Sequence, residues 1–289
     1  MAELDDVAAR AAAAVARDER IDAAIVTFLL RHYLATDAAD LRDALGLALA
    51  QALALAEHED TVIHRAAWLM LLIEATAVSD DERIRPAVAQ LASTLQALWP
   101  APMPIDDLAA SVEACLRAAE IIGPGAVVQD AIDQLERVIG GAYRPGDGLA
   151  RDRGGVRIRC GLADHVRCAS ALLTAFELTG RLPYSMLAEE LILVAGRGLT
   201  PNRPPEGGHD SFDAEEFVVQ CEAAGVLCRL ARLHDDPDYR GAAVVSTGAD
   251  YRAQASRILA AQSAHARTGT TSAAAAYGLA LRDLLQDVR

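Results

Sequence analysis

The chain has 289 residues, of which 52% are hydrophobic and only 4% aromatic, and its net charge at pH 7 is −14. Its length and apolar content allow a substantial buried core, and the scarcity of aromatic residues favours closely packed helices over a β-sandwich. The negative charge and the absence of any arginine-rich run exclude a nucleic-acid backbone as the expected partner. We therefore expect an all-α protein.

The first residues, the most apolar run and the cysteines of the chain indicate its cellular compartment. The start, MAELDD, lacks the basic and apolar segments of a signal peptide. The most apolar run, LGLALAQALALA at 45–56, is too short to span a bilayer. An odd number of cysteines fits reduced thiols better than a disulfide framework. The sequence thus predicts a cytoplasmic protein without a membrane span and with five free thiols, Cys115, Cys160, Cys168, Cys221 and Cys228.

One unit recurs along the chain: an apolar helix rich in small residues, a short turn and a second helix. Its clearest copies begin near Cys168 and Ala223. A single helix hairpin cannot bury its own apolar face, so such repeats stack on one another. At one constant offset, Ala169, Leu172, Leu178 and Tyr184 align with Ala224, Leu227, Leu233 and Tyr239.

Helical periodicity and helix breakers give the elements in chain order. They predict a first helix at 3–17, hairpins at 21–57, 62–99, 105–141, 163–199 and 213–264, and a last helix at 271–288. If the last of these twelve helices packs beside the first, the hairpins close into a single (α/α)6 toroid over residues 1–289. An open array of hairpins is the alternative.

Two long connections rich in Gly and Pro, at 140–161 and 200–211, are expected on one face of the toroid. Within the first, VRIRC at 156–160 alternates like a short strand or a small hairpin. The first helix of each hairpin carries the small residues that crowding at a toroid's centre requires. We expect the inner ring to contain the helices that begin near Thr61, Asp164, Asp213 and Thr271, with their N-termini beneath these loops.

Polar residues at these helix starts are the candidates for chemistry. Asp164 and His165 fit an acid/base or ligand-binding pair, although Asp164 also fits an ordinary helix cap. His209, Asp210 and Glu216, near Glu215, fit the proton-transfer groups of glycoside hydrolysis or sugar epimerisation. The alternative for Glu216 is a capping box with Asp213.

A further group of candidates would bind the ligand rather than transfer protons. His64 and Arg65 are placed to bind the polar edge of a sugar, and Trp68 to stack on its ring, unless Trp68 is a core residue. Arg153 belongs to a charged loop cluster that can reach over the mouth. We expect His64, His165 and His209 to approach a common pocket.

Other signatures give no support for a metal or a cofactor. The spacing of Cys160, His165, Cys168 and Cys221 does not match a zinc site. GPGAVV near Gly123 lacks the strand and the lysine of a phosphate loop, and the hydrolase and metalloprotease motifs G-x-S-x-G and H-E-x-x-H do not occur. We predict no metal ion and no cofactor.

The segment from Asp164 to Leu199, together with EAAGVLCRLARLHDDPDYRGAA, resembles two families. These are the helical half of thioredoxin-domain-associated proteins and the N-acylglucosamine 2-epimerase-like α/α toroids. The resemblance implies a toroid of six hairpins. We therefore expect a small polar ligand, carbohydrate-related, bound at the toroid mouth by a hydrolase or an isomerase. The alternative is a non-catalytic helical scaffold for a protein partner, and a homodimer is left open.

Overall fold

A computed structural model describes residues 2–17, 19–123, 125–154, 156–196, 214–243, 245–246 and 248–286. Most of these residues are helical, in elements whose lengths follow the predicted repeat. The helices are α1 (Ala2–Ala16), α2 (Ala23–Thr36), α3 (Arg42–Glu57), α4 (Val62–Ala75), α5 (Ile84–Leu98), α6 (Ile105–Ile122), α7 (Gly125–Ala142), α8 (Leu162–Thr179), α9 (Leu182–Gly196), α10 (Ala214–Asp235), α11 (Pro237–Ala243), α12 (Tyr251–Thr268) and α13 (Thr271–Gln286), with a 3-10 turn, η1 (Ala39–Leu41), before α3.

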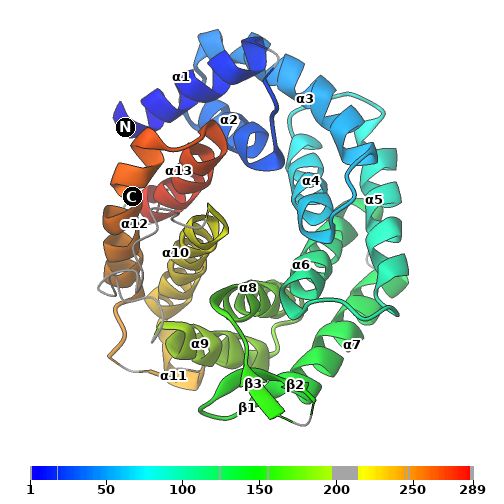
Figure 1. Cartoon of the computed structure of the whole chain (residues 1–289), viewed down its shortest axis with the longest axis vertical. Coiled ribbons are helices and arrows are strands. Elements are labelled where there is room, and N and C mark those ends of the chain that lie inside the picture. The colour runs from blue at the N-terminus through cyan, green and yellow to red at the C-terminus, as the bar shows by residue number, and fades with distance from the viewer. Residues whose placement is uncertain are drawn as a thin grey trace.

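The helices form two concentric rings, an (α/α)6 toroid (Figure 1). Helices α2, α4, α6, α8, α10 and α13 make the inner ring, and each packs against its two inner neighbours. Helices α1, α3, α5, α7, α9 and α12 lie outside them. The inner ring therefore includes the four helices predicted for it, those that begin near Thr61, Asp164, Asp213 and Thr271.

The ring closes where the two ends of the chain meet, as predicted. Helix α13 packs against α1 and α2. Arg10 of α1 donates hydrogen bonds to the carbonyl oxygens of Ala266 (3.0 Å) and Gly269 (2.8 Å) at the end of α12. Both terminal helices thereby bury their apolar faces, which rules out the open array.

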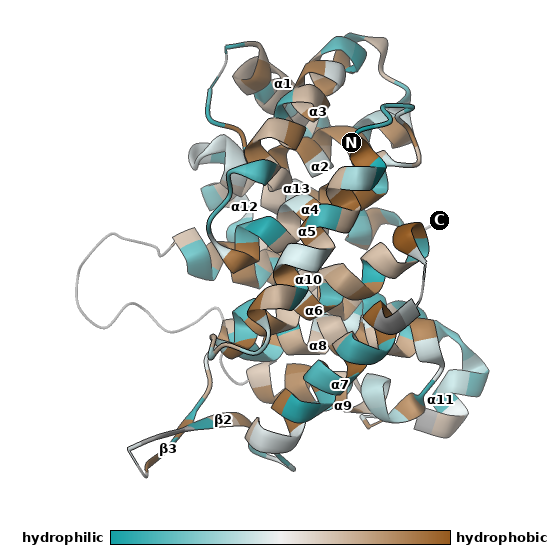
Figure 2. Cartoon of the chain, turned by 90° about the vertical axis from the view of Figure 1, so that its right-hand side faces the viewer, coloured by the Kyte–Doolittle hydropathy of each residue, from teal (hydrophilic) through white to brown (hydrophobic). Residues whose placement is uncertain are grey.

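Burial follows the position of each helix in the rings. The outer helix α5 buries one stripe, Ile84, Val88, Leu91, Ala92 and Leu95, at the spacing of a single helix face. The inner helix α8 is covered on most sides and buries almost every residue from Asp164 to Ala175. Figure 2 shows hydrophobic and hydrophilic residues alternating within single helices.

Two segments differ from the sequence-based expectation. The loop after α7 forms three strands instead of one hairpin: β1 (Tyr143–Arg144), β2 (Gly148–Arg153) and β3 (Val156–Arg159), paired antiparallel in that order. Figure 2 shows β2 and β3 extending beyond the helices. The connection between α10 and α12 contains the extra helix α11.

Buried Glu189 of α9 anchors that second connection. Its carboxylate accepts hydrogen bonds from the backbone N–H of Val245 (3.1 Å) and Ser246 (2.9 Å) and from the hydroxyl of Tyr251 (2.6 Å). These bonds satisfy a carboxylate with no exposed surface, so Glu189 holds the segment between α11 and α12 against α9.

The five cysteines are free and buried. Burial raises the pKa of the Cys115 and Cys221 thiols to about 12 and also raises the pKa of Cys168, so these side chains are poor nucleophiles. Across the described residues, every helix is too short or too polar to cross a membrane.

Candidate functional site

All six inner helices begin at the same end of the ring, which we call the mouth; their C-terminal end is the rear. Contacts between inner helices join start to start and end to end. At the mouth, Ser272 of α13 donates a hydrogen bond to Asp22, the N-cap of α2. At the rear, Arg31 near the end of α2 forms a salt bridge with Glu74 near the end of α4 (2.6 Å). Residues in the first turns of these helices therefore share the mouth.

The mouth carries acids from two inner helices around one arginine. Asp106 and Asp107 lie in the first turn of α6, and Glu215 in the first turn of α10. Arg167 of α8, which is only 8% exposed, forms salt bridges with Asp106 (2.8 Å) and with Glu222 of α10 (3.0 Å). This arginine ties α6, α8 and α10 together and holds Asp106 against its guanidinium.

The pKa of Asp107 is shifted by its surroundings. Burial raises its pKa above the ordinary value of 3.8, and the nearby carboxylates of Asp106 and Glu215 raise it further, against the opposing effect of Arg167 and His64. The cause is physical: ionised Asp107 is both partly desolvated and close to like charges. A carboxyl group that keeps its proton more readily is suited to act as a general acid.

Glu222 shows that solvent reaches into the ring below these acids. Burial among the inner helices raises its pKa, while Arg167 opposes the shift. Its side chain is nevertheless 34% exposed. Glu222, which lies one residue beyond the second turn of α10, is therefore partly accessible to solvent beside Arg167.

A polar network fills the ring further from the mouth. Arg229 of α10 donates hydrogen bonds to Glu113 of α6 (3.0 Å) and Glu177 of α8 (2.9 Å). Glu113 also accepts from the hydroxyls of Ser170 and Thr174, both at 2.8 Å. Glu113 follows Asp106 by seven residues on α6, so the network begins about 10 Å further along the helix axis. This network therefore lies deeper in the ring than the acids of the mouth.

The two residues predicted as a pair at the start of α8, Asp164 and His165, both make structural contacts. Asp164 is 3% exposed, accepts a hydrogen bond from the Gly161 backbone N–H (2.8 Å) and forms a salt bridge with Arg151 of β2 (2.8 Å). It thus caps α8 and holds the sheet against the helix.

His165 is also committed to the fold. It is 2% exposed; its Nε2 accepts a hydrogen bond from the Leu149 N–H (3.0 Å), and its Nδ1 lies 2.7 Å from the Gly161 carbonyl oxygen. These partners require a neutral ring protonated at Nδ1. Burial correspondingly lowers its pKa. Both ring nitrogens of His165 are thus bonded to backbone groups, which leaves neither of them free for a ligand.

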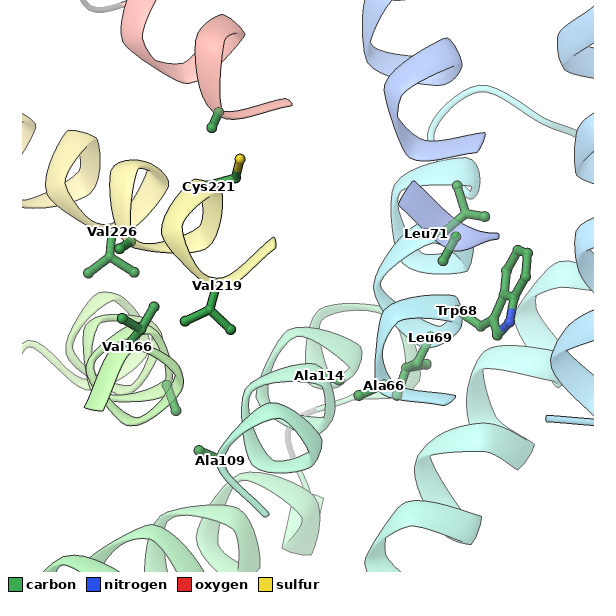
Figure 3. Packing of buried hydrophobic residues seen from close by; sticks show 14 of the residues in the cluster. Ala66, Trp68, Leu69, Leu71, Ala109, Ala114, Val166, Val219, Cys221 and Val226 are labelled. Carbon is green, nitrogen blue, oxygen red and sulfur yellow. The ribbon is translucent and has the colours of Figure 1, made fainter. Parts of the chain in front are cut away.

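The three candidates on α4 separate into two exposed or half-buried residues and one core residue. His64 is exposed at the mouth, 2.8 Å from the Thr61 hydroxyl, and the half-buried Arg65 donates to the Glu59 carbonyl oxygen. Trp68 is 3% exposed, and Figure 3 shows its indole on the side of α4 that faces away from α8 and α10. Trp68 therefore lies in the hydrophobic core, which was the alternative left open for it.

Of the remaining candidates, the structure describes the side chain of Glu216 only. Glu216 is exposed in the first turn of α10, where Gln220 donates to it at 3.5 Å. His209 and Asp210 lie outside the described residues, as does the side chain of Arg153. Their predicted roles stay predictions. Within the described part of the chain, no group of three His, Cys, Asp or Glu side chains is arranged to hold a metal ion.

Sequence reasoning missed the pair Asp106 and Asp107. The signal was present, since PIDD at 104–107 places two adjacent acids at the start of an inner helix. Acids in a first helical turn are also common because they interact favourably with the helix dipole. Their proximity to Glu215 depends on how α6 and α10 are arranged in the ring, which the sequence does not show.

No protein-family model matches the chain, and no curated protein matches it in sequence. Solved structures do match. The GH76A alpha-1,6-mannanase from Salegentibacter sp. HEL1_6 superposes with a TM-score of 0.65 at 10% identity, over 99% of this chain and 100% of that chain. The unsaturated glucuronyl hydrolase from Bacillus sp. GL1 gives a TM-score of 0.67 at 15% identity, over 92% and 85%.

A further match is a variant of the same mannanase described as inactive, with two adjacent aspartates replaced by asparagine, in complex with alpha-1,6-mannotriose. Its TM-score is 0.63 at 11% identity, over 91% of this chain and 87% of that chain. At these identities the likeness concerns the fold: the chain has the α/α toroid that these enzymes have.

Proposed function

We propose that this protein hydrolyses glycosidic bonds in a carbohydrate bound at the mouth, with Asp107 as general acid and Asp106 as its carboxylate partner. The observation that carries the proposal is the different environment of two adjacent acids. Asp106 is held in a salt bridge by Arg167, whereas burial and neighbouring carboxylates raise the pKa of Asp107. Two carboxyl groups in such different surroundings are suited to different roles, one as general acid and the other as general base.

The proposed reaction divides between the two carboxyl groups. Asp107 donates its proton to the glycosidic oxygen as the bond from that oxygen to the anomeric carbon breaks. Water adds its oxygen to the anomeric carbon, and Asp106 accepts the proton that water loses. Arg167 keeps Asp106 oriented throughout. Exposed His64, at the same mouth, is placed to hydrogen-bond sugar hydroxyls.

The neighbouring structures support the same reaction class. The mannanase and the glucuronyl hydrolase both act on carbohydrate, according to their names. The mannanase variant called inactive lacks two adjacent aspartates and is in complex with a mannose oligosaccharide. Asp106 and Asp107 are adjacent acids at the mouth of a similar ring, which supports, as a proposal, an equivalent function here.

The competing function is a scaffold that uses the acidic outer surface to hold a protein. A scaffold needs only an apolar plug at the centre of its ring, whereas an enzyme needs polar groups that converge there. Between the inner helices here, Arg167 pairs with Asp106 and Glu222, and Arg229 pairs with Glu113. This arrangement favours a polar ligand and a catalytic role. An isomerase would use the same groups without adding water.

The test compares Asp107→Asn and Asp106→Asn with Asp43→Asn, which removes a first-turn acid from the outer helix α3. Substrates are alpha-1,6-mannooligosaccharides, uronic-acid disaccharides and a panel of aryl glycosides. We expect a sugar to be cleaved by the wild type and by Asp43→Asn, and at least about 100-fold more slowly by Asp107→Asn. Binding of that sugar to Asp107→Asn, measured by calorimetry, should persist. Cleavage that survives both mouth substitutions would overturn the proposal, as would a failure of every sugar to bind.

A further inference from the structure

A cavity of about 430 Å³ opens at the rear, the end of the ring opposite the acids. It is lined by Arg31, Leu34 and Ala35 near the end of α2 and by Arg282, Asp283 and Gln286 near the end of α13. Its volume lies in the lower part of the range for small-molecule sites. Asp283 is near the end of its inner helix and Asp106 near the start of its own, so the cavity lies roughly 15 Å along the ring axis from the proposed catalytic acids.

The two arginines of this cavity differ in their partners. Arg31 donates to both oxygens of Glu74, at 2.9 and 2.6 Å, and lies 3.8 Å from Asp283. Arg31 therefore pairs with the carboxylates of both Glu74 and Asp283. Its guanidinium is held in place on the cavity wall and is compensated in charge.

Arg282 is buried without a carboxylate. It is 6% exposed, and in the described residues no carboxylate forms a salt bridge with it. Its Nη1 contacts Nδ1 of His32 at 3.2 Å, and its Nε is buried without a hydrogen-bond partner. Because arginine has no acceptor atom, His32 accepts this bond and is neutral. Burial and the nearby Arg31 both lower the pKa of Arg282, while Asp283 opposes them weakly.

A buried cation without a counterion is costly, and folded proteins ordinarily pair it. Here the unpaired guanidinium lines a cavity large enough for a small molecule. A second guanidinium, Arg31, borders the same space. An oxyanion in this cavity would supply the counterion that Arg282 lacks, beside the ion pair of Arg31 and Asp283.

We propose that the rear cavity is a binding site for a small oxyanion, a carboxylate or a phosphate, recognised by Arg282 with Arg31. The site does not depend on the proposed hydrolase. Arg282 also holds His32, whose Nε2 lies 3.3 Å from Asp5 of α1. An anion bound here therefore reinforces the contact of α13 with α2 and α1, where the ring closes.

Inorganic phosphate and gluconate serve as the probes, titrated separately at constant ionic strength while the melting temperature is followed. We expect at least one of them to give a saturable rise of about 5 °C well above its dissociation constant. Phosphate alone or gluconate alone would identify the oxyanion. Arg282→Leu should abolish the rise, whereas Arg85→Leu, an exposed arginine of the outer helix α5, should retain it.

A second variant guards against a failure of Arg282→Leu to fold. Ala35 is exposed at the rim of the cavity, and Ala35→Phe would fill the space without touching either guanidinium's charge. Calorimetry should then show phosphate or gluconate binding to the wild type and at least a tenfold loss in Ala35→Phe. No binding of either probe to the wild type, or equal binding to all variants, would overturn the proposal.

Discussion

Helices α6 and α8 both begin at the mouth with acidic residues, and the two starts have opposite surroundings. At α8, Asp164 and His165 are buried, and the polar contacts of both are made by the fold, to Gly161, Arg151 and Leu149. At α6, partial burial raises the pKa of Asp107, and the nearby carboxylates of Asp106 and Glu215 raise it further.

This difference separates a structural helix start from the one proposed to be functional. Groups whose hydrogen bonds are all made internally lower the free energy of the folded state and have nothing left to offer a ligand. A carboxyl group placed beside like charges raises that free energy, and such sites persist where chemistry requires a shifted pKa. The comparison predicts opposite consequences for substitutions at the two helix starts.

The largest expected effect is on stability, from His165→Ala at the α8 start. The change leaves the Leu149 N–H and the Gly161 carbonyl without partners and opens a cavity in the core. We expect the free energy of unfolding to fall by about 2–5 kcal/mol, measured by urea denaturation. His64→Ala, at an exposed histidine, should change it by less than about 0.5 kcal/mol. Equal stability of the two variants would refute the structural role of His165.

A pair of glycines sharpens the same point. Gly146 and Gly148 both have positive φ, 80° and 77°. A Cβ on Gly148 would lie 2.6 Å from Nε2 of His165 and 2.8 Å from Val194 Cγ1, whereas a Cβ on Gly146 would meet nothing within 4 Å. Gly146→Ala should therefore cost only the backbone strain, about 1–2 kcal/mol.

Gly148→Ala should cost about 1–3 kcal/mol more than Gly146→Ala, because the new methyl group displaces His165 or Val194. Thermal unfolding of the two variants side by side measures the difference. Equal losses would mean that the sheet can move away from α8 without penalty, and that the contact between β2 and His165 is loose.

The pH dependence of stability should have opposite signs at the two helix starts. The lowered pKa of His165 means that the unfolded chain binds its proton more readily. Its contribution is complete above the ordinary histidine pKa of 6.5 and is lost as the pH falls through the lowered value. Between pH 7 and 5 the wild type should lose up to about 1.4 kcal/mol per pH unit more than His165→Gln. Parallel stability curves would contradict a buried neutral His165.

The fold could be predicted because its signals are local. Helical periodicity, small residues on the first helix of each hairpin, and turns such as the one at Gly180, where φ is 68°, gave the ring and its closure. Helix α11 has only seven residues, too few for a periodic pattern, and β1 has two. Both are formed by contacts that the surrounding structure supplies, such as the anchoring of the connection after α11 by Glu189.

The site could be predicted from the sequence only in part, because it depends on which residues contact one another in the folded chain. The mouth was predicted from the helix starts, and His64 does lie there. His165 has the residue type of a catalytic base, but its partners Leu149 and Gly161 are set by the folding of the sheet onto α8. For Trp68, a helical position alone did not determine which side of α4 the indole would occupy.

The smallest expected effect, and the one that best isolates the α6 start, is a gain in stability from Asp107→Asn. Because the pKa of Asp107 is raised, its stabilising contribution is present below the ordinary value of 3.8 and is lost as the pH rises through the raised value. At pH 7 the amide should remove the repulsion from Asp106 and Glu215 and raise the melting temperature by roughly 1–3 °C. Asp43→Asn removes only a favourable interaction with a helix dipole and should lower it slightly. The gain should shrink as the pH falls toward the ordinary value of 3.8, because Asp107 then takes up its proton in the wild type. A loss in Asp107→Asn as large as in Asp43→Asn would place Asp107 with the ordinary helix-start acids and remove the physical basis for its catalytic role.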